Sequence, residues 1–213
     1  RAHHYEALLR PIPTPANPYG EPSEFLALAE TVGLSEALDW AVVETACEAA
    51  RAAAGARIAC NLSGLTLQNP AFRQQLCALL EASPDLAGRL LVEITETAEI
   101  EDEGEAIRTV DALRGLGLPV CIDDFGAGAA AFRYLRLFRV DFVKVDGIYV
   151  THAVESDRDR GFIAAMVDLA RTVGARVVAE KIETEAQAAL MQELGVTFGQ
   201  GFLFGRPGAL PGQ

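Results

Sequence analysis

Seven short apolar runs alternate along this 213-residue chain with longer segments in which apolar residues recur at helical spacing. The short runs predict β-strands and the longer segments predict α-helices. Such an alternation favours a parallel sheet, because the crossover between two parallel strands is long enough to hold a helix. The predicted strands are Tyr5–Arg10, Arg57–Asn61, Leu90–Glu93, Pro119–Asp123, Phe142–Val145, Val177–Glu180 and Thr197–Gln200.

The predicted helices lie between these strands: Ser23–Thr31, Glu36–Ala54, Pro70–Ala82, Glu103–Leu116, Ala129–Leu137, Asp157–Val173 and Glu185–Leu194. An α/β fold with a parallel sheet follows, and the sheet is either open or closed into a (β/α)8 TIM-like barrel. A barrel of this kind has eight strands, so we expect an eighth strand to lie upstream of Arg1 if the sheet is closed.

Two adjacent carboxylates, Asp123 and Asp124, follow the apolar run that ends at Ile122, and Phe125-Gly126 comes directly after them. Adjacent ionised carboxylates repel each other, and burying them is unfavourable unless a cation lies between them. A divalent metal ion would satisfy this requirement. By itself the motif favours an ordinary Asp-rich loop or an Asx turn over a metal site, and the rest of the chain reverses that preference.

Polar residues stand at or near the end of almost every predicted strand. In a (β/α)8 barrel the carboxyl ends of the strands meet on one face, where the catalytic residues of this fold lie. Each residue alone has an ordinary structural explanation, but together they would place five carboxylates in one mouth. The set therefore favours a barrel with a metal site and comprises Glu6, Asn61, Glu93, Asp123, Asp124, Lys144, Glu180 and Gln200.

Charge and composition exclude some function classes. The formal net charge of −12 argues against a duplex nucleic acid as partner, because such partners are held mainly by Lys and Arg. Apolar residues make up half of the chain, yet none of the apolar runs is long enough to cross a membrane, so we expect no membrane insertion by this domain. The cysteines Cys47, Cys60, Cys77 and Cys121 are widely spaced within apolar stretches, which fits a reducing cytoplasm.

With Glu6-Ala7-Leu8 included, the chain resembles the EAL-domain family of cyclic di-GMP phosphodiesterases. The resemblance extends almost to Pro207 and is specific because seven short motifs occur in the right order. The motifs are Glu6-Ala7-Leu8-Leu9-Arg10, Asn61-Leu62-Ser63, Glu93-Ile94-Thr95-Glu96, Asp123-Asp124-Phe125-Gly126, Lys144-Val145-Asp146, Ala179-Glu180-Lys181-Ile182-Glu183 and Gln200-Gly201.

The resemblance implies a (β/α)8 TIM-like barrel with an antiparallel first strand, and that first strand is the piece expected to be missing from this chain. It implies a single EAL-type domain over residues 1–213, a fragment of a larger signalling protein. It further implies a homodimer in the cytoplasm, either free or as the cytoplasmic portion of a membrane-anchored protein.

The resemblance also implies roles for individual residues. Glu6, Asn61, Glu93 and Asp123 would bind one divalent cation, and Asp123, Asp124 and Glu180 would bind a second. Lys144 would orient a water molecule, and Gln200 would act through water. Arg10 and Leu8 would contact the substrate, and Glu96 would support the loop after Asp124. Oxygen ligands of this kind suit Mg²⁺ or Mn²⁺, two ions per active site, while Ca²⁺ is expected to inhibit.

The reaction implied is hydrolysis of cyclic di-GMP to linear pGpG without a covalent enzyme intermediate. Two alternatives stay open: a receptor domain that binds cyclic di-GMP with weak or no turnover, and an enzyme acting on another phosphoester. Three departures from the commoner family pattern are visible. Pro11 stands where Trp is frequent, Lys181 stands where Gly is frequent, and the loop Ala127–Ala131 is unusually rich in alanine.

Overall fold

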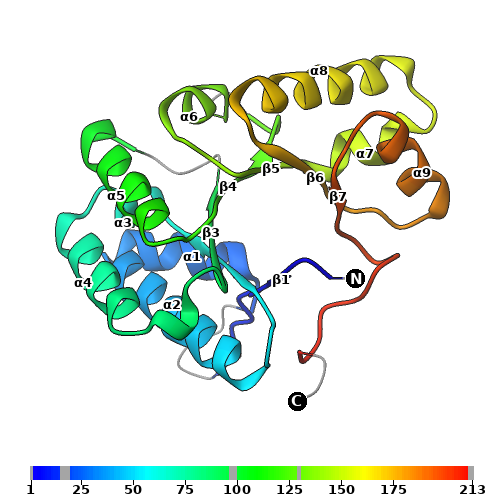
Figure 1. Ribbon diagram of the computed structural model, residues 1–213. Helices are drawn as coiled ribbons and strands as arrows, with labels where there is room; N and C mark the ends of the chain where they lie inside the picture. Colours follow the sequence, from blue (N-terminus) through cyan, green and yellow to red (C-terminus); the bar gives the residue numbers. More distant parts are fainter. Residues whose placement is uncertain (1, 15–19, 96–99, 129–130, 211–213) are drawn as a thin grey trace. The chain divides into compact units, whose positions relative to one another are not determined.

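The computed structural model describes residues 2–14, 20–95, 100–128 and 131–210 (Figure 1). The chain forms two compact units. The first contains the chain as far as Val92 and the segment that ends at Leu118, and the second contains the residues from Glu93 to the end of its strand and the segment Pro119–Gly208. The prediction of a single domain over residues 1–213 stays a prediction.

The first unit begins with a short strand and is rich in helices. Its elements are β1 (Tyr5–Glu6), α1 (Pro22–Thr31), α2 (Ser35–Ala52), β2 (Ile58–Leu62), α3 (Gly64–Leu67), α4 (Pro70–Glu81), the 3₁₀ turn η1 (Pro84–Leu86), the first half of β3 (Leu90–Thr95) and α5 (Glu103–Gly115).

The second unit continues from the end of β3. Its further elements are β4 (Val120–Phe125), α6 (Ala131–Leu137), β5 (Phe142–Val145), α7 (Gly147–Ala153), α8 (Asp157–Val173), β6 (Arg176–Ala179), α9 (Glu185–Glu193) and β7 (Phe198–Gly199). In Figure 1, α7 and α8 lie side by side. Arg160 on α8 holds them together, because its guanidinium donates to the carbonyls of Ala153 at 2.7 Å and Val154 at 2.6 Å.

Every strand pairing recorded for the described residues is parallel, which confirms the predicted α/β class. These pairings are β1 with β2, β4 with β5, β5 with β6 and β6 with β7. Hydrogen-bonded neighbours follow chain order, β1-β2-β3 in the first unit and β3 to β7 in the second. The central strands are buried almost throughout, as is usual for the strands of a parallel sheet.

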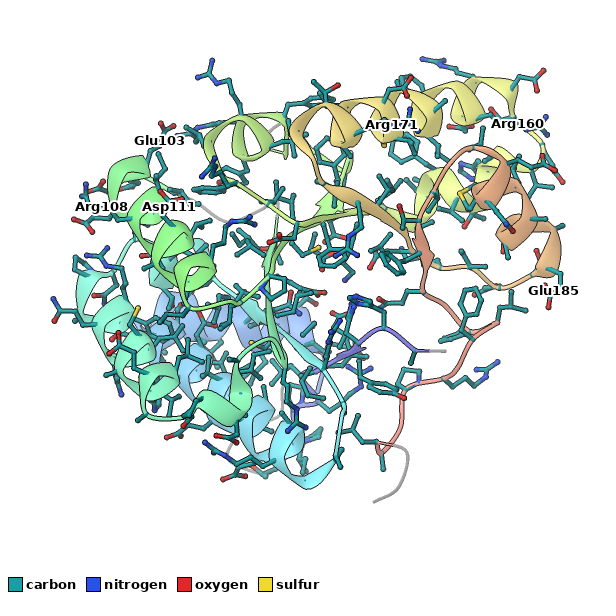
Figure 2. The ribbon with its side chains drawn as sticks, viewed as in Figure 1. Glu103, Arg108, Asp111, Arg160, Arg171 and Glu185 are labelled. Atoms are coloured by element: carbon teal, nitrogen blue, oxygen red, sulfur yellow. The ribbon has the colours of Figure 1, made fainter. Side chains whose placement is uncertain are left out.

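Local sequence signals explain where the helices begin and end. Asn69 caps α4 as predicted, because its Oδ1 accepts from the backbone N–H of Ala71 at 2.8 Å and Pro70 occupies the first turn. Helix α8 is capped by Ser156 and ends at Gly174, whose φ of +80° is left-handed. Arg160 and Arg171 stand towards its two ends (Figure 2), while Ile163, Met166, Val167 and Ala170 are buried.

Some predicted boundaries are wrong. The first strand ends at Glu6 rather than Arg10, and β7 is shorter than predicted. Helices α3 and α7 were not predicted, because α3 is only one turn long and α7 begins with glycine and contains three β-branched residues. Residues 129 and 130 of the helix predicted over Ala129–Leu137 lie outside the described residues.

Within the described ranges, every helix is too short or too polar to cross a lipid bilayer.

Candidate functional site

Five of the predicted site residues come together at the carboxyl ends of adjacent strands in the second unit. Glu93 lies on β3, Asp123 and Asp124 on β4, Lys144 on β5, and Glu180 directly follows β6. Glu93, Asp123 and Lys144 are buried, and the other two are half-buried. Parallel strands bring these ends to one edge of the sheet, which is why residues distant in sequence become neighbours.

Lys144 lies at the centre of this cluster. Its Nζ is 3.1 Å from Glu93 Oε2, 3.0 Å from Asp123 Oδ1 and 2.9 Å from Glu180 Oε1. Only 1% of its side chain is exposed. A buried ammonium ion is strongly disfavoured unless carboxylates surround it, and here three of them do.

A β-bulge explains how both adjacent aspartates reach the cluster. The register pairs Ile122 with Val143 and Phe125 with Val145, so Asp123 and Asp124 together lie opposite the single residue Lys144. In a regular strand neighbouring side chains point to opposite faces. The extra residue, with Asp124 in the left-handed conformation at φ +53°, removes that alternation. Asp123, Asp124 and Glu180 can therefore offer oxygen atoms that all lie within 4.8 Å of one another.

The cluster has more acidic groups than one lysine can balance. Three carboxyl groups, those of Glu93, Asp123 and Glu180, pair with the ammonium of Lys144, and a fourth, that of Asp124, lies close to Asp123 and Glu180. Burial, followed by the carboxylates of Asp123 and Asp146, raises the pKa of Asp124, while Lys144 and Lys181 act in the opposite direction. Closely spaced carboxylate oxygens with an excess of negative charge are the donor set that Mg²⁺ and Mn²⁺ prefer. The residues present fit a divalent cation.

Glu6 and Asn61 meet in the first unit, at the ends of β1 and β2. Asn61 Nδ2 donates to Glu6 Oε1 at 3.2 Å. The other polar atom of this amide, Oδ1, is buried and accepts no hydrogen bond from the described residues. A buried acceptor without a donor is unfavourable, and a cation would satisfy it. This orphaned oxygen is a second observation that fits the predicted metal-binding role of Asn61.

Asp39 is a supporting residue that sequence reasoning missed. On α2 it is almost wholly buried, and its Oδ2 accepts from the backbone N–H of Ser63 at 2.8 Å and from Ser63 Oγ at 2.7 Å. Burial raises the pKa of this carboxyl. Ser63 also caps α3, so Asp39 holds the turn that directly follows Asn61. The available signal was an acidic residue inside the apolar stripe of a predicted helix.

The backbone places Gln200 beside the end of β6. Its N–H donates to Ala179 O at 2.8 Å, and its carbonyl accepts from Ile182 N at 3.0 Å. The next residue, Gly201, has φ +151°, and a Cβ there would overlap backbone atoms of Ile182. Only glycine allows the two segments to approach so closely, and this approach keeps the backbone of Gln200 beside Ala179 and Ile182, which lie on either side of Glu180 in the sequence.

The remaining predicted site residues are not among those described above at the ends of the strands. Leu8 and Arg10 are exposed, and Arg10 Nη1 donates to Leu9 O at 2.7 Å. Their predicted role in substrate binding stays a prediction. Glu96, predicted to support the loop after Asp124, lies outside the described residues.

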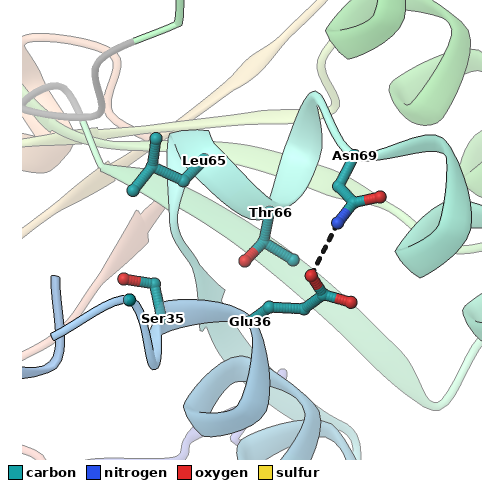
Figure 3. Close-up of a pocket in the computed structure, with 6 residues that line it drawn as sticks. Ser35, Glu36, Leu65, Thr66 and Asn69 are labelled. Carbon is teal, nitrogen blue, oxygen red and sulfur yellow. Dashed lines mark hydrogen bonds between the residues drawn. The ribbon is translucent and has the colours of Figure 1, made fainter.

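A separate hollow in the first unit contains none of the predicted site residues (Figure 3). It is lined by Gly33, Ser35, Glu36, Leu65, Thr66 and Asn69. Its charged group is already engaged, because Glu36 Oε2 accepts from Asn69 Nδ2 at 2.6 Å, and Asn69 is the cap of α4. The hollow is therefore explained by contacts between α2, α3 and the start of α4.

This is an α/β domain with parallel strands. Its strand ends bring four carboxyl groups close to a buried lysine, and such a site fits a divalent cation. The EAL domain family model matches residues 1–207, and the chain belongs to that family. The resemblance stated from the motifs is thereby confirmed.

Named relatives carry this domain within longer proteins. The bifunctional diguanylate cyclase/cyclic di-GMP phosphodiesterase MucR of Pseudomonas aeruginosa is 33% identical over 192 residues, which are 87% of this chain and 28% of MucR. The cyclic di-GMP phosphodiesterase PdeF of Escherichia coli is 33% identical over 190 residues, 87% of this chain and 25% of PdeF. The chain thus spans about a quarter of the length of these relatives.

Solved structures agree with the fold. The PaMucR phosphodiesterase in complex with c-di-GMP has a TM-score of 0.80 at 32% identity, covering 95% of this chain and 83% of that one. The calcium/cy-diGMP complex of Klebsiella pneumoniae BlrP1 has a TM-score of 0.78 at 31% identity, covering 95% of this chain and 50% of that one. These matches confirm the predicted fold class, that of EAL domains.

Proposed function

We propose that this domain hydrolyses cyclic di-GMP to linear pGpG with two divalent cations, Mg²⁺ or Mn²⁺, as cofactors. The observation that carries the proposal is the cluster around Lys144 in a chain of the EAL family, because it unites an acidic cation site with a buried lysine. The names of MucR and PdeF as cyclic di-GMP phosphodiesterases support the choice of substrate.

Two groups of ligands are assigned in this proposal. Glu6, Asn61, Glu93 and Asp123 would hold one cation, and Asp123, Asp124 and Glu180 would hold the other, so Asp123 would belong to both groups. The spacing of the second group's oxygens and the orphaned Oδ1 of Asn61 support these assignments. When bound, the cations supply charge neutralisation at the phosphoryl oxygens and a lowered pKa for the attacking water.

The chain's own residues then orient the reactants. The Lys144 ammonium, held here by three carboxylates, would exchange one of these ion pairs for a hydrogen bond to the attacking water when those carboxylates bind the cations, and it would keep the water in line with phosphorus. The water oxygen bonds to phosphorus, the P–O3′ bond breaks, and the 3′ oxygen gains a proton as the water loses one. Gln200 acts through a second water, while Arg10 and Leu8 contact the dinucleotide.

The proposal also covers the cellular location and the oligomeric state of the domain. We assign the domain to the cytoplasm, where its four cysteines, all free thiols, stay reduced. We also propose that residues 1–213 act as one domain of a longer signalling protein and that the domain forms a homodimer.

The test is to incubate the purified domain with cyclic di-GMP and Mg²⁺ and to separate the products by chromatography. The proposal expects pGpG to accumulate with time and a metal chelator to stop the reaction. Binding of labelled cyclic di-GMP without turnover in either Mg²⁺ or Mn²⁺ would instead make the domain a receptor.

The matched variant is Asp123→Asn, which keeps size and polarity but removes the bridging charge. Hydrolysis should be abolished, and binding of both cations should weaken. Near-wild-type turnover of this variant at saturating Mg²⁺ would refute the bridging role of Asp123.

A further inference from the structure

Two residues other than glycine have a positive φ among the described residues, and both lie at the acidic cluster. Asp124 and Lys181 each have φ +53°. Side chains are disfavoured in this region, so such a conformation persists only where surrounding contacts enforce it. For Asp124 the β-bulge supplies the reason, whereas Lys181, the residue after Glu180, needs another.

Gly147 determines where the side chain of Lys181 lies. A Cβ added to Gly147 would overlap the Cβ, Cγ and Cδ atoms of Lys181. The stem of the lysine therefore crosses directly over this glycine. The ammonium group lies 3.8 Å from Oδ1 of Asp146, the residue before Gly147. Two strand ends, after β5 and after β6, together hold the lysine in place.

Lysine is rare in this chain, and Lys181 is one of only two. Of the eighteen Lys and Arg residues only two are lysines, and the other one is Lys144. Lys181 is largely exposed, with 68% of its side chain accessible, while Asp146 is mostly covered at 17%. A Coulomb interaction links Lys181 with Asp124. A second positive charge thus acts on Asp124, one of the three carboxylates of the Asp123–Asp124–Glu180 cluster.

We propose that the positive charge of Lys181 lowers the affinity of the Asp123–Asp124–Glu180 cluster for a divalent cation. The inference rests on the proposed function. The ammonium repels the incoming cation directly, and by pairing with Asp146 it also offsets a carboxylate that would otherwise attract the cation. Both effects have the same sign. For partly exposed charges several ångströms apart, removal of the lysine charge should tighten cation binding roughly threefold to tenfold.

The experiment is a titration of the purified domain with Mn²⁺ alone, in which free Mn²⁺ is measured by electron paramagnetic resonance. Lys181→Gln and Lys181→Gly should both bind Mn²⁺ more tightly than wild type, and the gain should shrink at about 1 M salt, where surface charges are screened. Lys181→Arg keeps the charge and should behave as wild type. Arg171→Gln, which removes an exposed cation from α8 before the opposite end of β6, should also leave Mn²⁺ binding unchanged.

Three outcomes would overturn the inference. The Mn²⁺ affinity of Lys181→Gln could lie within twofold of wild type, Lys181→Arg could bind Mn²⁺ as tightly as Lys181→Gln, or no variant could bind Mn²⁺ at all. Because the readout is metal binding, it separates from the proposed activity. If the Lys181 variants bind Mn²⁺ more tightly but no pGpG forms, the phosphodiesterase activity is refuted and the role of Lys181 stands. If pGpG forms but the Mn²⁺ affinity of the variants is unchanged, the role of Lys181 is refuted and the activity stands.

A double-mutant cycle tests the geometry itself. Gly147→Ala should destabilise the protein in the wild-type background, because the new methyl group meets the lysine stem. The same substitution in a Lys181→Gly background should cost clearly less, since the stem is gone. Equal costs in the two backgrounds would show that Lys181 does not lie over Gly147.

Discussion

Lys144 contacts three carboxylates while almost fully buried, and this single residue shows how the candidate site is balanced at the scale of side chains. The lysine has a structural role beside its proposed chemical one, because Glu93, Asp123 and Glu180 would repel one another without it. The two roles can be separated by experiment, since the structural role affects the free energy of unfolding and the proposed chemical role affects the rate of hydrolysis.

Replacing Lys144 with Met should lower kcat by orders of magnitude with little change in KM, because a group that orients water acts mainly in the transition state. In metal-free buffer the same variant should lose about 3–5 kcal/mol of unfolding free energy, as buried pairs do when one partner is removed. Urea unfolding with and without Mg²⁺ checks this, and added Mg²⁺ should restore part of the loss. A sharp rise in KM at unchanged kcat would make Lys144 a substrate anchor.

Asp39 allows a second prediction at this scale. Asp39→Ala should reduce the free energy of unfolding by about 1.5–3 kcal/mol, because Ser63 loses the acceptor of two hydrogen bonds. Asp39→Asn retains an oxygen acceptor and should cost less. Thermal or urea unfolding of both variants provides the measurement, and equal losses would mean that the hydrogen bonds do not explain the burial of this carboxyl.

At the scale of helices and strands, regular apolar spacing made most of the elements predictable. Strand β5 and helix α8 have the predicted bounds, since β5 is apolar apart from Lys144 and α8 has a Ser cap and a Gly stop. The β-bulge at Asp123 and Asp124 could not be predicted, because it depends on how β4 pairs with β5. The same holds for the position of Lys181 over Gly147, which brings together residues that follow two different strands, β6 and β5.

The candidate metal ligands could be proposed as a set from the sequence, because each lies at or near the end of a predicted strand. The residues that support them could not. The cap contact between Asp39 and Ser63 joins residues 24 positions apart, and no local pattern indicates it. The shortness of β1 was equally invisible, because Ala7, Leu8 and Leu9 continue the apolar pattern after the strand has ended.

Helices α4 and α5 are joined by an ion pair that predicts an acid-dependent stability. Glu105 accepts from Arg73 Nη1 and Arg108 Nη2, each at 2.5 Å. Hydrogen bonds from Arg108 and then Arg73 lower the pKa of Glu105 from 4.5 to about 2. A carboxyl whose pKa is lower in the folded state stabilises the fold above its unfolded pKa, and this stabilisation is lost as the pH falls towards the folded value.

Glu105→Gln should therefore be less stable than wild type at pH 6, and the difference should narrow as the pH is lowered from 4.5 towards 2. Urea midpoints at pH 6 and pH 3 provide the comparison. Glu48→Gln, on the exposed face of α2, serves as the control and should show no such convergence. A difference between Glu105→Gln and wild type that is constant with pH would contradict the assigned pKa.

At the scale of the whole molecule, the acidic composition and the candidate site act together. The formal net charge is −12, so the proposed function requires bound cations to hold an anionic dinucleotide close to the carboxylates. Metal identity should consequently decide between binding and turnover.

Ca²⁺ should support binding of cyclic di-GMP but not its hydrolysis. Calcium accepts the same oxygen ligands, but its coordination is looser and longer, roughly 2.3–2.6 Å against roughly 2.0–2.1 Å for Mg²⁺, and it orients water less strictly. The calcium/cy-diGMP complex of BlrP1 is in keeping with binding. Fluorescence titration of labelled cyclic di-GMP in Ca²⁺, followed by a product assay, checks both parts, and efficient turnover in Ca²⁺ would contradict the geometric argument.

The scarcity of lysine has a practical consequence for proteolysis. An endoprotease specific for lysine can cut this chain only after Lys144 and Lys181. The bond after Lys181 lies outside any helix or strand, and cleavage there would release a fragment that carries α9 and β7. The bond after Lys144 lies within β5 and becomes accessible only when that strand leaves the sheet. The ratio of the two cuts therefore reports directly how often the acidic cluster opens.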